Sequence, residues 1–116
     1  HRNGNCFEIN GSKGSVYFNF ERMNELLYYS TEDEEGLQGF RRVQTTEAIH
    51  PYMEAWWPAG HIIGYEHTFI HEMKDFLEAI VYDRMPEPNF FDGVACQKVL
   101  DAVEKSIEGR CWVKVD

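Results

Sequence analysis

The chain has 116 residues, of which 43% are hydrophobic, 15% aromatic and 27% charged, and its formal net charge is -9. This composition is typical of one globular domain and excludes a disordered segment. The negative charge repels nucleic-acid backbones, and no apolar run approaches the roughly 20 residues that a membrane helix needs. We therefore expect neither nucleic acid nor a membrane as a partner.

The first part of the sequence predicts four strands. Cys6–Asn10 and Ser15–Phe20 flank a glycine-containing turn, and alternating apolar and polar residues in the second of them indicate a half-buried strand, so the pair predicts a β-hairpin. Glu25–Thr31 and Phe40–Glu47 are the third and fourth predicted strands. The acidic segment Thr31–Gly39 between them is typical of a solvated loop.

A long ordered loop is predicted at His50–Tyr65, because this segment contains two prolines and two glycines and has no sustained periodicity. Long irregular segments inside a compact domain are usually functional. Trp56 and Trp57 are large apolar side chains within this loop, so we expect them to have a use.

Helical periodicity begins at about Glu66 and continues to Tyr82, where apolar residues recur at a spacing of roughly 3.6. A second amphipathic helix is expected to begin with Asp92 as its N-cap and to end at Gly109. Arg110–Val115 predicts a last strand. Strands followed by helices favour an α+β fold, a mainly antiparallel open sheet with two helices packed on one face through their apolar stripes.

Three of the five histidines, His61, His67 and His71, lie close together in the sequence. On a helical wheel His67 and His71 fall opposite the apolar stripe, as neighbours four residues apart. This face is interpreted as solvated; a role in a pocket, or in a zinc site with a third ligand, stays open as an alternative. The H-E-x-x-H motif is absent, because Asp75 stands where its second histidine would be, and we predict no metal site.

The cysteines, Cys6, Cys96 and Cys111, are widely spaced and odd in number, which predicts buried free thiols in a reducing compartment. No signal peptide is visible, so we expect a cytoplasmic protein. The sequence contains no nucleophile elbow and no glycine-rich nucleotide-binding loop.

Three segments together resemble the C-terminal end of Gfo/Idh/MocA-type oxidoreductases, the relatives of glucose–fructose oxidoreductase and inositol dehydrogenase. Their most distinctive feature is Pro88, Phe90, Asp92 and Gly93 in the pattern P-x-F-x-D-G, followed by a helix and a W-V-x-V ending. The other two segments are Phe7–Tyr29 and Gly60–Ile80. The resemblance implies part of a C-terminal domain like that of dihydrodipicolinate reductase, in a two-domain enzyme whose N-terminal Rossmann domain binds NAD or NADP.

The resemblance also implies a catalytic lysine in an E-K-P motif and an Asp-x-x-x-His pair, and neither motif occurs in this sequence. We therefore expect no catalytic and no cofactor-binding residue in this sequence. The chain opens without methionine, and we expect it to be the C-terminal fragment 1–116 of a longer NAD(P)-dependent sugar or polyol oxidoreductase. This fragment would lack the Rossmann domain and would be inactive alone. Trp57, His61 and Tyr65 are the candidates for the substrate-pocket wall, because aromatic faces and histidine suit sugars. The free sheet face is expected to pair in a homo-oligomer through Tyr17, Asn19, Tyr28 or Tyr29, and Arg41. The alternative is a stand-alone binding or dimerisation module without catalysis.

Overall fold

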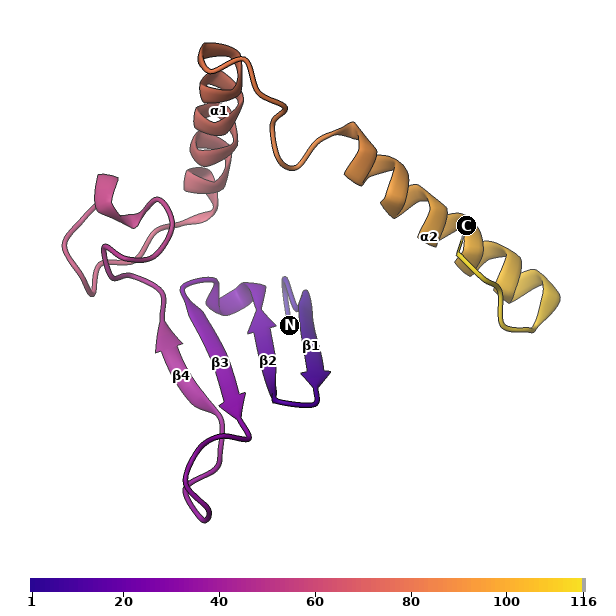
Figure 1. Ribbon diagram of the computed structural model, residues 1–116, viewed down its shortest axis with the longest axis horizontal. Helices are drawn as coiled ribbons and strands as arrows, with labels where there is room; N and C mark the ends of the chain where they lie inside the picture. The colour runs from indigo at the N-terminus through magenta and orange to yellow at the C-terminus, as the bar shows by residue number, and fades with distance from the viewer. Residues whose placement is uncertain (116) are drawn as a thin grey trace. The chain divides into compact units, whose positions relative to one another are not determined.

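The computed structural model describes residues 1–115, which divide into two compact units, His1–Phe69 and the residues from Ile70 onwards. The first unit contains an open antiparallel sheet whose four strands lie side by side in chain order (Figure 1). The strands are β1 (Cys6–Gly11), β2 (Gly14–Asn19), β3 (Glu25–Ser30) and β4 (Arg41–Gln44). The four predicted strands and the β1–β2 hairpin are confirmed, with some shift at their ends.

Strand register separates the side chains of the sheet into two kinds of row. Antiparallel pairing aligns Phe7, Phe18, Leu26 and Val43 in an apolar row that crosses all four strands. The neighbouring row, Glu8, Tyr17, Leu27 and Arg42, carries the charged residues. Since successive side chains of a strand point to opposite faces, one face of the sheet is apolar and the other is largely polar.

A series of aromatic rings connects the apolar sheet face to the start of the first long helix. Phe7 lies 5.5 Å from Phe18 between ring centroids, and Phe18 lies 6.4 Å from Phe20. Phe20 contacts Tyr65 at 5.7 Å, edge to face, and Tyr65 contacts Phe69 at 5.1 Å. Edge-to-face aromatic pairs add about 0.5–1.5 kcal/mol beyond their buried area, so this series stabilises the first unit.

Two α-helices follow the sheet, α1 (Tyr65–Val81) and α2 (Phe90–Gly109). The start of α2 differs from the prediction, because Asn89 is the N-cap. Its side chain accepts a hydrogen bond from the Phe91 amide at 2.8 Å, and Asp92 accepts one from the Asn89 amide at 2.8 Å. Asp92 therefore closes a capping box from the third helical position instead of capping the helix itself.

The end of α2 also differs from the prediction. Gly109 is still helical, and Arg110 adopts the left-handed conformation with φ 48°. The predicted strand Arg110–Val115 is wrong, since no strand forms there in the described chain. The Ser106 hydroxyl donates a hydrogen bond to the Cys111 carbonyl at 2.7 Å, which holds the chain against the helix end. A strand needs a neighbouring ladder, and an apolar alternation by itself does not supply one.

The apolar stripes of the two helices are about half exposed within the described residues. Phe76 is 51% exposed and Leu100 is 54% exposed, while Ala79 and Ala102 are the buried residues of the described helices. The α+β class with an open antiparallel sheet is confirmed, and the packing of helices on one sheet face stays a prediction. No helix among residues 1–115 has the length and apolar character that crossing a bilayer requires.

Candidate functional site

The segment between β4 and α1 is an ordered loop, as predicted, and it contains a short 3-10 helix, η2 (Met53–Ala55). Met53 is 3% exposed and is the apolar anchor of the loop. Thr46 is 2% exposed, and its hydroxyl accepts a hydrogen bond from the Gly60 amide at 3.2 Å. Gly60 has φ 88°, a conformation that glycine adopts readily. These contacts bring two distant parts of the loop together and fix its fold.

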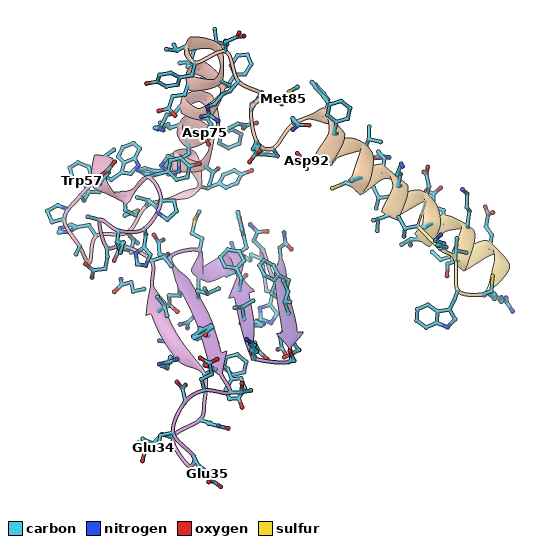
Figure 2. All side chains as sticks on the ribbon, in the orientation of Figure 1. Glu34, Glu35, Trp57, Asp75, Met85 and Asp92 are labelled. Atoms are coloured by element: carbon cyan, nitrogen blue, oxygen red, sulfur yellow. The ribbon has the colours of Figure 1, made fainter. Side chains whose placement is uncertain are left out.

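Trp57 and His61, two of the three predicted pocket residues, are exposed residues of this loop, and Figure 2 labels Trp57 there. Trp57 is 59% exposed, so its ring face is accessible to a ligand. His61 Nδ1 lies 2.8 Å from the Pro58 carbonyl oxygen, which can only accept, so Nδ1 carries the proton. In this tautomer the lone pair of Nε2 can accept a hydrogen bond from a hydroxyl group.

Tyr65, the third predicted residue, opens α1 and is 56% exposed. Its ring packs between Phe20 and Phe69, which fixes its direction. The three candidates therefore lie on one loop and on the helical turn that follows it. His61 and Tyr65 are each held by local contacts, and within residues 1–115 no hydrogen bond or ring contact joins any two of the three candidates.

His67 lies differently from its prediction. Its side chain is 15% exposed, and its ring contacts Trp56 edge to face with 4.5 Å between centroids. Its Nδ1 accepts a hydrogen bond from the Gly64 amide at 3.0 Å. His67 thus joins the loop to the first turn of α1 and does not lie on a solvated face. A helical wheel could not predict that His67 is covered, because it places only the residues of the helix and takes no account of a preceding loop that folds back on it.

The polar face of the sheet carries a shallow groove that the sequence did not predict as a site. It is lined by Tyr17, Asn19, Arg22, Glu25, Leu27 and Arg42. The Glu25 carboxylate lies 3.5 Å from an Arg22 nitrogen and 3.4 Å from the Arg42 Nε. A hydrogen bond with the Cys6 thiol raises the pKa of Tyr17 above its ordinary value of 10, which already leaves the phenol neutral at pH 7. The groove therefore combines two guanidinium groups, a shared carboxylate and an uncharged phenol.

The residues predicted to face an oligomer partner are divided between the two sheet faces. Tyr17 and Asn19 line the polar groove, and Tyr29 shares their face by strand alternation. Tyr28 and Arg41 lie on the opposite face, where the Arg41 guanidinium stands 5.4 Å from the Tyr28 ring centroid. The predicted set therefore does not form one surface.

The cysteines are free, as predicted, but they are exposed instead of buried. Cys6 lies on the edge strand β1, and the other two lie on or just after α2, whose surface is half exposed. Within residues 1–115, no three histidine, cysteine or acidic side chains gather closely enough to hold a metal ion.

The chain is similar to known sugar dehydrogenases and to other oxidoreductases. Levoglucosan dehydrogenase of Pseudarthrobacter phenanthrenivorans is 41% identical over 110 residues, which are 94% of this chain and 28% of that protein. Among solved structures, an oxidoreductase domain protein from Kribbella flavida matches with a TM-score of 0.90 and 48% identity over 96% of this chain and 30% of its own. No protein-family model matches the chain.

A structure of levoglucosan dehydrogenase in complex with NADH and levoglucosan matches with a TM-score of 0.87 and 39% identity over 96% of this chain. The chain spans about 28–30% of the length of these relatives. Nearly all of it therefore corresponds to one part of a longer oxidoreductase, in agreement with the resemblance carried by its sequence segments. The chain is therefore similar to about 30% of the length of these oxidoreductases, as expected for the C-terminal domain of a Gfo/Idh/MocA-type enzyme.

Proposed function

We propose that this chain is the C-terminal part of an NAD(P)-dependent oxidoreductase that acts on a hydroxyl group of a sugar or polyol. The observation that carries the proposal is the match of 96% of the chain to an enzyme solved with NADH and levoglucosan. The hydride chemistry belongs to the nicotinamide cofactor. Cofactor and catalytic acid/base would be held mainly by sequence preceding residue 1, since this sequence contains neither a nucleotide-binding loop nor the family's lysine and histidine motifs.

The contribution of this chain to the substrate pocket would come from Trp57, His61 and Tyr65. An exposed indole ring offers an apolar face to the C–H face of a sugar, and His61 Nε2 offers an acceptor to a hydroxyl. Pockets of this kind combine aromatic walls with a few fixed polar groups. The ordered loop supports the proposal, because the Thr46–Gly60 hydrogen bond holds the loop backbone and the contact with the Pro58 carbonyl orients the His61 ring before a ligand arrives.

Kinetics of the full-length natural protein test this pocket. Trp57→Ala and His61→Ala are each expected to raise the KM for the sugar about tenfold, a loss of about 1.4 kcal/mol of binding free energy, while the KM for the nicotinamide cofactor stays unchanged. Ile49→Ala is the matched control, because Ile49 is 89% exposed on the same loop. Unchanged sugar KM in both pocket variants would remove these residues from the pocket.

We further propose that the polar sheet face pairs with that of a second copy. Two facing sheets can be related by a two-fold axis parallel to their strands, which sets β1 of one copy over β4 of the other. The charged row is self-complementary under this operation: Glu8 meets Arg42, and Tyr17 meets Leu27. The Arg42 side chain is 61% exposed, so donors beyond its contact with Glu25 are available.

Charge reversal distinguishes this arrangement from others. In sedimentation analysis of the full-length natural protein, Glu8→Arg and Arg42→Glu should each weaken association, and the double variant should restore it. Arg41→Glu is the control, because Arg41 lies on the opposite sheet face. A double variant that associates no better than the single variants, or a wild-type protein that is monomeric, would contradict the pairing.

We also propose a cytoplasmic location. Three free and exposed thiols support it, because exposed cysteines persist unpaired in reducing compartments. Fractionation of source cells, with the thiols trapped by an alkylating reagent during lysis, tests the proposal. Recovery of the protein outside the cytoplasm, or with its thiols oxidised, would contradict it.

A further inference from the structure

Asn24 lies immediately before β3, far from the long loop in sequence, and its side-chain amide bonds one residue of that loop twice. Asn24 Nδ2 donates a hydrogen bond to the Ile63 carbonyl at 2.8 Å, and Asn24 Oδ1 accepts one from the Ile63 amide at 3.0 Å. The amide group thus imitates a backbone peptide unit. Both polar groups of a half-buried loop residue are satisfied by a single side chain.

The backbone of Asn24 holds the other end of the same loop. Its carbonyl accepts a hydrogen bond from the Thr45 amide at 2.9 Å and another from the Thr45 hydroxyl at 3.1 Å. Thr45 directly follows β4, and Ile63 nearly adjoins α1. One residue of the sheet unit therefore fixes both the start and the end of the loop that carries Trp57 and His61.

We propose that Asn24 is a positioning residue, which sets the conformation of the loop at residues 46–62 and thereby the place of the sugar-binding side chains. The consequence for sugar binding rests on the proposed function, whereas the effect on the loop does not. Asparagine is suited to this position because it offers one donor and one acceptor in a plane. Leucine offers neither, and an ionised aspartate offers only acceptors and sets a carboxylate oxygen against the Ile63 carbonyl.

Amide hydrogen exchange of the full-length natural protein measures the effect on the loop. Asn24→Leu is expected to speed exchange in residues 46–62 at least about tenfold, the equivalent of about 1.4 kcal/mol, because two hydrogen bonds are lost. Asn24→Asp should also speed it, and exchange in the β1–β2 hairpin should stay as in the wild type. Asn10→Ala is the control, because the Asn10 side chain bonds to Glu8 and Ser15 within that hairpin.

Kinetic measurements on the same variants separate this inference from the proposed function. Asn24→Leu should raise the KM for the sugar and leave the KM for the nicotinamide cofactor unchanged. A faster-exchanging loop with unchanged sugar KM would refute the pocket and leave the positioning role standing. If Asn24→Leu does not fold, Thr45→Val removes only the hydroxyl bond and should speed exchange at the start of the loop. Unchanged loop exchange, or equal acceleration throughout the sheet, would overturn the inference.

Discussion

Replacement of Thr46 by valine removes one hydroxyl group from the interior of the long loop and leaves the side-chain shape nearly unchanged. Thr46 is 2% exposed, and its hydroxyl oxygen accepts the hydrogen bond from the Gly60 amide at 3.2 Å. In the valine variant the Gly60 amide loses its acceptor inside the loop.

A net hydrogen bond contributes about 0.5–1.5 kcal/mol, and a buried donor left without a partner costs about 1–3 kcal/mol. The Thr46–Gly60 bond is at the long end of the usual distance range, and Gly60 itself is exposed. Both facts favour the lower part of the interval of about 1–3 kcal/mol for the lost free energy of unfolding. We expect Thr46→Val to lower the free energy of unfolding by about 1–2 kcal/mol.

Denaturant titration followed by circular dichroism measures this difference, provided that wild type and variant show the same dependence on denaturant concentration. Thr68→Val is the comparison, because Thr68 is exposed and its hydroxyl bonds the Tyr65 carbonyl within α1. Its loss should stay within about 0.5 kcal/mol. A Thr46→Val variant as stable as wild type, or no less stable than Thr68→Val, would refute the role assigned to this hydroxyl.

Three further predictions concern other parts of the chain. His67→Ala should destabilise by about 1–2 kcal/mol in denaturant titration, since it removes the contact with Trp56 and a helix-end hydrogen bond, whereas a solvated histidine would show almost no change. Asn89→Ala should lower stability by about 1 kcal/mol, seen as a lower denaturation midpoint, and Asn89→Asp should retain most of it. Hydrogen bonds from the amides of Asn3 and Arg2 hold the pKa of Glu21 below its ordinary value of 4.5. The ionised carboxylate therefore stabilises the N-terminal segment above that pH and loses this effect as the pH falls through the lowered pKa; a carbon-13 titration with a midpoint at or above 4.5 would contradict it.

The strands and helices were predictable because their signals are local. Alternation in β2 and the 3.6-residue period of α1 depend on neighbours within a few residues, and both elements form where expected. Arg110–Val115 was not predictable on the same basis, because a strand exists only beside a partner strand. What covers the apolar face of α1 was not predictable for a related reason, since a helical period indicates an apolar face but does not say which element packs on it.

The candidate site was predictable as a loop but not in its internal organisation. Pro51, Pro58 and the glycines indicated irregular backbone, and Trp57 was recognisable as a costly exposed ring. The roles of Asn24 and His67 depend on contacts between segments that are distant in sequence or on opposite sides of a loop boundary. An asparagine before a strand or a histidine in a first helical turn is common, so neither residue could be recognised from the sequence alone.

Steady-state kinetics of the full-length natural protein with NAD or NADP and a panel of sugars and polyols test the proposed function most directly. We predict formation of reduced nicotinamide that depends on at least one sugar or polyol, together with a KM for that substrate that rises in Trp57→Ala and not in Ile49→Ala. A correctly folded protein that binds neither nicotinamide nor sugar, and reduces no cofactor with any member of the panel, would contradict the oxidoreductase function and favour a stand-alone binding or dimerisation module.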